Sequence, residues 1–333
     1  LAERLPDVPV SISSEVAPQM REFERFNTVC ANASVQPLIA TYPRNLEAQL
    51  LETGATCPVY LIHSGGGLIN VDGAARFPVR LVESGPAGGA IFAADIAARH
   101  GLDRVLSYDM GGTTAKICLI ENQMPRTAKT FEVARTHRFT KGSGMPISIP
   151  VIEMIEIGAG GGSIATVDAL GQIRVGPLSA GSEPGPAAYG LGGVEPTVSD
   201  ANLVLGRLSA DTFGAPGIDL DDEAARDALN RTVGSALAMD AETAAAGVAE
   251  VVDENMANAA RVHAVENGKD VAAFTVIAFG GGAPLHAGRL CEKLDVDELL
   301  VPPGASVGSA IGFLRAPFAY EALRSHHAAI DQF

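Results

Sequence analysis

The sequence predicts an α/β protein in which mixed sheets are flanked by helices. Two apolar segments, DRVLSYD (103–109) and AKICLIENQ (115–123), read as strands joined by a short glycine turn, and FTVIAF (274–279) reads as a further buried strand. Helical signals dominate residues 221–267, where apolar residues recur at three- and four-residue spacing. Strands and helices that alternate in this way indicate the α/β class.

The other elements follow from local signals taken along the chain. Residues 58–84 predict a strand, a glycine turn and more extended chain, and residues 85–101 predict a helix that ends at a glycine. Residues 154–176 predict a second strand pair turned by glycines, and TVSDANLVLGRL (197–208) predicts a helix with a Ser/Asp cap. A helix at 285–294, a strand at 298–303 and a small-residue helix at 304–317 complete the series.

Composition narrows the classes of function. The net charge of −15 over 333 residues argues against a nucleic-acid binder, because phosphate backbones need a cationic face. No apolar run approaches the length of a membrane span, so we expect no membrane partner. Four widely spaced cysteines, none in a CxxC pair, argue against a zinc site or a disulfide framework and predict buried free thiols in a reducing cytoplasm.

The segment DMGGTTAKICLI (109–120) is the first candidate for chemistry. Glycines leave backbone N–H groups open to a polyphosphate, threonines add hydroxyl donors, and an aspartate at a strand end can hold Mg²⁺ through water. Walker and Rossmann loops lead into a helix, whereas this loop leads into a strand. That leaves the strand–turn–strand cradle of the actin, sugar kinase and heat-shock chaperone ATPases, with a plain hairpin turn as the alternative.

A second glycine run, FGGGAP (279–284), lies between a buried strand and a helix, where an adenosine could rest. It comes about as far after the first loop as an adenosine loop should in those ATPases. Two Ala/Gly-rich helices, at 85–98 and 304–314, bracket the two loops in the order expected of hinge helices that cross closely. A pair of tightly packed core helices is the alternative for them.

Several other residues remain open between a site and ordinary structure. The glycine-rich loops at 158–163 and 179–193 either border the site or form structural turns. His63 and His286 sit beside glycine turns, and each is either a functional contact or a structural residue. Carboxylates near the two glycine-rich loops are expected to be solvated or capping, with Asp200 a helix cap; they are Glu153, Glu156, Asp168 and Asp200.

Taken together, the motifs resemble a known family. SGPAGG, DMGGTTAK, IGAGGGSIA, PTVSDANLVLGRL and AFGGGAPLHAGRL are similar to blocks of the hydantoinase A/5-oxoprolinase family, in the family's order, from about residue 10 to 320. That family includes the large subunit of ATP-dependent N-methylhydantoinase and the related acetone and acetophenone carboxylase subunits. The resemblance implies an actin-like ATPase fold, with residues 1–84 the remainder of a first lobe and residues 85–333 the second lobe.

The resemblance also implies an activity and a site. It implies a cyclic amide hydrolase that uses ATP and Mg²⁺ to phosphorylate the substrate carbonyl and that works with a hydantoinase B-type subunit. A carboxylase subunit acting on a ketone and a non-catalytic nucleotide-binding module are the alternatives. Asp109, Thr113 and Lys116 would be catalytic, with Asp109 also the metal ligand. Nucleotide would be bound by two loops, formed by Gly111, Gly112, Thr113 and Thr114 and by Gly280, Gly281 and Gly282.

The chain departs from the family's pattern in two respects that bear on the site. Lys116 stands where many members carry an aspartate, so a second carboxylate is in doubt there and a cation is offered to phosphate instead. No upstream phosphate loop of the form DVGGTFTD is present. We therefore expect a piece of a longer ATPase whose first phosphate loop lies elsewhere, and we expect residues 1–333 alone not to hydrolyse ATP.

Overall fold

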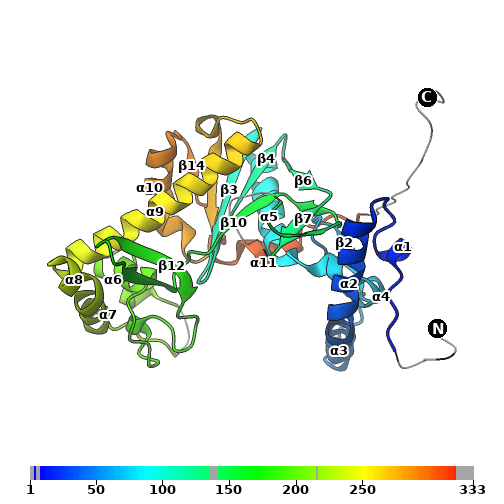
Figure 1. Cartoon of the computed structure of the whole chain (residues 1–333), viewed down its shortest axis with the longest axis horizontal. Coiled ribbons are helices and arrows are strands. Elements are labelled where there is room, and N and C mark those ends of the chain that lie inside the picture. Colours follow the sequence, from blue (N-terminus) through cyan, green and yellow to red (C-terminus); the bar gives the residue numbers. More distant parts are fainter. Residues whose placement is uncertain (1–3, 5–7, 135–141, 215–216, 320–333) are drawn as a thin grey trace. The chain divides into compact units, whose positions relative to one another are not determined.

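A computed structural model describes residues 4, 8–134, 142–214 and 217–319 (Figure 1). The chain divides into two compact units that do not follow the order of the sequence. Unit 1 combines residues 1–92, 126–153 and 309–333, and unit 2 combines residues 93–125 and 154–308. The lobe boundary expected at residues 84 and 85 stays a prediction.

Unit 1 is a set of helices with small antiparallel sheets. Its helices are α1 (Ser13–Val16), α2 (Glu22–Ile39), α3 (Thr41–Glu52), α4 (Val71–Arg76) and the 3-10 helix η1 (Pro78–Leu81). Its strands pair as β1 (Tyr60–Ile62) with β2 (Leu68–Asn70), β6 (Thr127–Ala128) with β9 (Val151–Ile152), and β7 (Phe131–Val133) with β8 (Met145–Ile147). A small apolar core of Val16, Val79, Ile147, Ile149 and Val151 holds these pieces together.

Unit 2 is built on a mixed sheet. The strand order is β10 (Met154–Ile157), β4 (Ala115–Glu121), β3 (Arg104–Met110), β13 (Thr275–Phe279) and β14 (Leu299–Leu300), with β5 (Met124–Pro125) pairing with β4. β3 and β4 form the expected antiparallel hairpin, and β13 pairs in parallel with β3. A separate hairpin joins β11 (Ser163–Val167) to β12 (Ile173–Ser179).

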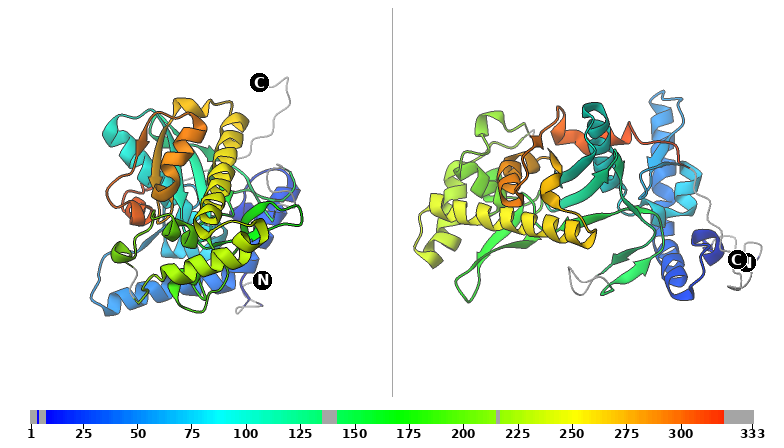
Figure 2. Two further views of the ribbon diagram at one scale, coloured as in Figure 1. Left: turned by 90° about the vertical axis from the view of Figure 1, so that its left-hand side faces the viewer. Right: turned by 90° about the horizontal axis from the view of Figure 1, so that it is seen from above.

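Helices and short helical turns accompany the strands of unit 2. They are η2 (Ala187–Tyr189), α6 (Val198–Val204), η3 (Ala210–Thr212), α7 (Asp222–Leu229), the π-helix η4 (Asn230–Gly234), α8 (Ser235–Leu237), α9 (Ala241–Glu266), η5 (Val271–Ala273), α10 (Ala283–Leu294) and η6 (Ala305–Val307). The long helix α9 contacts α6, α7 and β10, and it runs beside α10 in each view (Figure 2). Its apolar stripe is buried at Val248, Val252 and Met256, whereas Val262 at the end of the stripe is partly exposed.

The two Ala/Gly-rich helices cross as expected. They are α5 (Ser84–His100) and α11 (Gly308–Phe313). A Cβ built on Gly312 would lie 1.8 Å from the carbonyl oxygen of Gly88, so only glycine permits this approach. The close crossing is confirmed within unit 1, and a hinge role stays a prediction.

One local expectation was wrong. Residues 71–76 are helical rather than extended, because Asn70 caps the helix by accepting a hydrogen bond from the Gly73 N–H. The strand pair expected within residues 154–176 is confirmed as β11–β12, and its turn is at Asp168–Gln172, where the Asp168 carboxylate accepts backbone N–H bonds. The glycines at 158–162 instead connect β10 in the main sheet to β11.

Candidate functional site

Three glycine loops follow strands that end at one edge of the main sheet. β3 and β13 are parallel, with Asp109 opposite Phe279, so the loops after them begin side by side. β10 is antiparallel to β4, which is antiparallel to β3, and therefore runs in the same direction as β3. Its loop, residues 158–162, begins at the same edge. The topology thus brings together loops separated by about 50 and 170 residues of sequence.

The carbonyl groups of the β3–β4 loop are covered by the 158–162 loop. Gly161 N–H donates to the Gly111 oxygen at 3.0 Å, and Gly162 N–H donates to the Gly112 oxygen at 2.6 Å. A Cβ on Gly160 would lie 2.7 Å from the Gly111 oxygen and 2.8 Å from the Gly112 carbonyl. Close packing of backbone against backbone therefore accounts for glycine at position 160.

Several backbone amides in the β3–β4 loop and in the loop after β13 have no hydrogen-bond acceptor among the residues that the structure describes. Within the described part of the chain, the N–H groups of Gly112, Thr113 and Gly281 donate to no other group, and all three residues are exposed. A Cβ on Gly112 or Gly281 would meet no atom within 4 Å, and neither has a positive φ. Nothing in their surroundings requires glycine there, whereas the close approach of an anion to the backbone would.

The loop after β13 packs onto the hairpin beside Asp109. Gly282 N–H donates to the Met110 oxygen at 2.9 Å. Gly280 has φ +86°, and a Cβ there would lie 2.5 Å from Asp109 Oδ1. The half-buried Asp109 carboxylate therefore lies directly beside the backbone of the second loop.

The predicted site residues come together in unit 2. Lys116 Nζ lies 3.3 Å from Thr114 Oγ1, which brings a cation to the wall of the loop, and 3.2 Å from Glu156 Oε1. Asp109 and Lys116 are directly opposite each other on β3 and β4. One carboxylate, one cation and free amides thus lie at the same sheet edge as the Gly280–Gly282 loop.

The two glycine-rich loops at 158–163 and 179–193, each predicted either to border the site or to form structural turns, both lie beside these residues. Gly162 accepts from the Ala180 N–H at 2.9 Å, which attaches the 179–193 loop to the 158–162 loop. Gly161 accepts from the Ser199 N–H at 2.7 Å. The Tyr189 hydroxyl is hydrogen-bonded to Ser199, and burial raises the pKa of Tyr189. Backbone hydrogen bonds from Ala180 and Ser199 therefore hold the 158–162 loop in place.

Asp200 is confirmed as a capping residue. Thr197 and Asp200 form a capping box at the start of α6, and the Asp200 carboxylate also accepts from the Ala187 and Ala188 N–H groups. Burial raises the pKa of Asp200, and hydrogen bonds from the N–H groups of Ala188, Thr197 and Ala187 and from the Thr197 hydroxyl oppose that rise. Asp200 therefore holds η2 and the start of α6 together.

Sequence reasoning missed Asp253, which belongs to a buried cluster under the second loop. His286 on α10 is completely buried, and its Nδ1 lies 2.6 Å from Asp253 Oδ1 on α9. The Asn202 amide of α6 donates to His286 Nε2 at 3.0 Å, so the ring proton sits on Nδ1 and is donated to Asp253. Arg207 approaches the other Asp253 oxygen at 3.7 Å. His286 is therefore a core residue that ties three helices together.

The remaining polar candidates are structural. His63 Nδ1 accepts the Gly65 N–H at 3.0 Å and closes the β1–β2 turn, and burial, with a contribution from Arg80, lowers the pKa of His63. Glu153 pairs with Arg126, and Asp168 pairs with Arg174. Cys118 and Cys291 are buried as expected, but Cys30 and Cys57 are exposed. The described residues contain no group of three or more His, Cys, Asp or Glu that could hold a metal ion.

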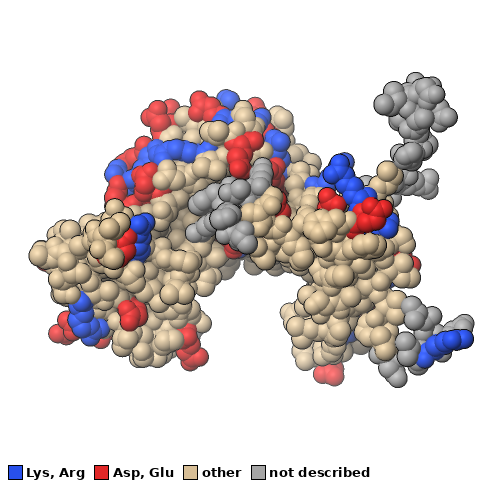
Figure 3. Space-filling model, viewed as in Figure 1, with Lys and Arg blue, Asp and Glu red and all other residues tan. Residues whose placement is uncertain are grey.

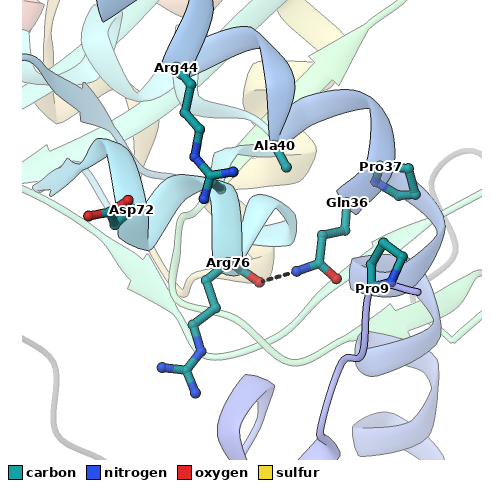
Figure 4. A pocket seen from close by; sticks show the side chains of 8 residues that line it. Pro9, Gln36, Pro37, Ala40, Arg44, Asp72 and Arg76 are labelled. Carbon is teal, nitrogen blue, oxygen red and sulfur yellow. Dashed lines mark hydrogen bonds between the residues drawn. The ribbon is translucent and has the colours of Figure 1, made fainter. Parts of the chain in front are cut away.

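A cavity of about 620 Å³ lies in unit 1 and contains none of the predicted site residues. Gln36, Arg44, Asp72 and Arg76 line it, and Gln36 donates to the Arg76 carbonyl (Figure 4). Its charged side chains are exposed.

Among the described residues, no helix combines the length and the apolar character needed to cross a bilayer.

The mixed sheet, its glycine-turned β3–β4 hairpin and the neighbouring glycine loops belong to an actin-like ATPase fold. The chain belongs to the hydantoinase/oxoprolinase family, whose pattern matches residues 25–322. It is 36% identical over 327 residues to the caprolactamase subunit alpha of Pseudomonas jessenii, covering 98% of this chain and 46% of that one. It is 33% identical over 307 residues to the acetophenone carboxylase gamma subunit of Aromatoleum aromaticum, covering 92% of this chain and 40% of that one.

The solved structures agree with the sequence relatives. The crystal structure of the ATP-dependent caprolactamase from Pseudomonas jessenii matches with a TM-score of 0.80 and 35% identity, over 96% of this chain and 45% of that one. The expected family and fold are confirmed. The chain spans less than half the length of each of these relatives.

Proposed function

We propose that this chain carries part of the nucleotide site of an ATP-dependent cyclic amide hydrolase. The observation that carries the proposal is the β3–β4 loop, whose carbonyls are covered by Gly161 and Gly162 while the N–H groups of Gly112 and Thr113 stay free and exposed. Such a row of free amides is a preformed site for anions. The Gly280–Gly282 loop beside it would take the adenosine.

The residues present fit a magnesium ion. Mg²⁺ in phosphate sites is commonly held by one or two carboxylates together with phosphate oxygens and water. Asp109 offers one carboxylate at the end of β3, next to the free amides. When bound there, Mg²⁺ would neutralise charge on the transferring phosphoryl group.

The protein groups would act by positioning and by charge. Lys116 offers a cation to the phosphates, and Thr113 and Thr114 offer N–H and hydroxyl donors. The γ-phosphoryl group would pass from ATP to the carbonyl oxygen of a cyclic amide, and ADP would be released. An amide oxygen is a poor leaving group, and phosphorylation converts it into a good one. No covalent enzyme intermediate is needed, because orientation and charge neutralisation supply the catalysis. The names of the caprolactamase relative and of the family support an amide substrate.

A carboxylase subunit is the second candidate. The acetophenone carboxylase relative is nearly as similar as the caprolactamase relative. The same site would then phosphorylate an enolised ketone or bicarbonate. Both relatives are named as subunits, which supports a partner chain, and we propose one of the hydantoinase B type.

Calorimetric titration with Mg²⁺ATP tests the nucleotide site. We expect saturable binding that Asp109→Ala abolishes. Asp103→Ala is the matched control, because Asp103 is an exposed aspartate just before the other end of β3. Equal binding by all three proteins would refute the assignment of Asp109.

Product analysis separates the two activities. The protein is assayed with its partner subunit, ATP and either a lactam, hydantoin or 5-oxoproline, or a ketone with bicarbonate. Ring-opened product coupled to phosphate release supports the hydrolase, and carboxylated ketone supports the carboxylase. Phosphate release with neither product would leave the chain as a nucleotide-binding module.

A further inference from the structure

Three charged side chains form a row across the sheet immediately before the glycine loops. Glu156 on β10 is directly opposite Lys116 on β4, and Lys116 is directly opposite Asp109 on β3. Residues that pair directly across neighbouring strands project on the same face. The row therefore places one cation between two carboxylates, within reach of the loop that offers free amides.

The structure shows how Lys116 is held. Its Nζ contacts Glu156 Oε1 at 3.2 Å and Thr114 Oγ1 at 3.3 Å. The Glu156 side chain is 48% exposed and that of Lys116 is 21% exposed. The Lys116–Glu156 pair is therefore partly exposed to solvent, and Lys116 also contacts Thr114, a residue of the β3–β4 loop.

We propose that Glu156 is a positioning residue that holds Lys116 beside the β3–β4 loop and releases it when a polyphosphate binds. The proposal rests on the nucleotide site proposed above. A half-exposed carboxylate–ammonium pair is weak in water, so it is easily exchanged. A nucleotide phosphate brings more than one negative charge to a loop whose amides are already free. The compact, flexible ammonium group of lysine can follow that charge without a change in the backbone.

This exchange predicts that removing the carboxylate tightens binding. Glu156 competes with phosphate for Lys116. Glu156→Gln keeps the length of the side chain and an oxygen that can accept from Lys116, but it removes the charge. We expect Mg²⁺ATP to bind about two- to five-fold more tightly to the variant, which is the range of exposed ion pairs. A residue that served only to stabilise the fold would weaken binding when replaced.

The sequence offers a matched control on the same strand. Glu121, at the other end of β4, forms a lysine–carboxylate pair with Lys269 at 2.6 Å, with side-chain exposures of 32% and 30%. It lies five residues from Lys116, roughly 17 Å along an extended strand. Glu121→Gln removes the same charge from the same strand, and we expect it to leave ATP affinity unchanged.

Titration calorimetry on the purified protein tests the proposal with ATP and with adenosine. We expect Glu156→Gln to tighten ATP binding, to leave adenosine binding unchanged, and to lose most of its effect when Lys116 is replaced by Met. Equal or weaker ATP binding by Glu156→Gln would overturn the proposal. A gain that persists with adenosine or with Lys116→Met would also overturn it. Failure of the unaltered protein to bind ATP at all would instead overturn the nucleotide site itself.

Discussion

Gly160 and Gly112 lie in two loops that pack directly against each other, yet their replacement by alanine should affect stability differently. A Cβ at position 160 would lie 2.7–2.8 Å from three backbone atoms of Gly111 and Gly112, against 3.4–4 Å for ordinary contacts. Backbone cannot move aside as the end of a side chain can, so the 158–162 loop must shift. The shift strains the Gly161–Gly111 and Gly162–Gly112 hydrogen bonds.

The magnitude follows from these contacts. Overpacking typically costs 1–3 kcal/mol, and each weakened hydrogen bond adds about 1 kcal/mol at most, so we expect Gly160→Ala to destabilise unit 2 by roughly 2–4 kcal/mol. For a unit of this size that lowers Tm by roughly 5–15 °C. At position 112 a Cβ meets nothing within 4 Å. Gly112→Ala should therefore leave Tm unchanged or raise it slightly, because alanine reduces the entropy of the unfolded chain.

The assay combines thermal unfolding with ATP titration. We expect Gly160→Ala to lower Tm. We expect Gly112→Ala to keep Tm but to weaken ATP binding, because the methyl group at position 112 would occupy the space in which we propose that phosphate binds. If Gly112→Ala lowered Tm as much as Gly160→Ala does, a side chain at position 112 would have to clash with a neighbouring group, which would contradict the open space described there. If both variants bound ATP as tightly as the unaltered protein, the loop would be an ordinary hairpin turn.

Two further predictions concern the helices that carry the second loop. His286→Ala leaves the buried Asp253 without its partner, and we expect a loss of about 3–5 kcal/mol in the free energy of unfolding measured with denaturant; a loss below 1 kcal/mol would contradict the buried pair. Glu250 has its pKa lowered to about 2 by hydrogen bonds from Arg289 and then Lys293. Because the folded pKa is depressed, this stabilisation is complete above pH 5 and is lost as pH falls toward 2. Its partly exposed setting limits it to less than about 1 kcal/mol. Glu250→Gln should therefore lower Tm slightly at pH 7 and by less at pH 2.5, and an equal difference at both pH values would contradict the assignment.

The local sequence pattern was sufficient to predict those elements of unit 2 whose contacts lie close together in the sequence. The β3–β4 hairpin was predictable because alternating apolar residues on both sides of MGGTT require a turn between two paired strands. The helix α6 was predictable because a Ser/Asp capping signal precedes apolar residues at helical spacing, although the N-cap is Thr197 and Asp200 caps from the third helical position. These signals depend only on neighbours within a few residues.

Contacts between distant segments were not predictable in the same way. Nothing near residue 160 in the sequence shows that its backbone lies against residue 111, because the reason for glycine is a carbonyl about 50 residues away. The helix at residues 71–76 was missed for another reason. Gly73 lowers its helix propensity, while the capping bond from Gly73 to Asn70 that compensates is visible only in the structure.

The charged surface of α9 and α10 shows why the buried cluster was hidden in the sequence. Acidic residues of α9 pair with cations of α10 on the exposed side, where Figure 3 shows charges of both signs interspersed. Asp253 reads as one more member of that acidic series, since it lies between Glu250 and Glu254. Only the packing of α10 against α9 turns it inward to His286.

The buried pair of His286 and Asp253 helps to fix the positions of the loops of the candidate site. Asn202 and His286 connect α6, whose first turn contacts the 158–162 loop through Ser199, to α10, which begins immediately after Gly280–Gly282. Two of the three glycine loops thus depend on one buried hydrogen-bonded cluster for their relative position. A rigid connection of this kind is what a site needs when its catalytic contribution is orientation rather than covalent chemistry, because small errors in the position of phosphate donors are costly.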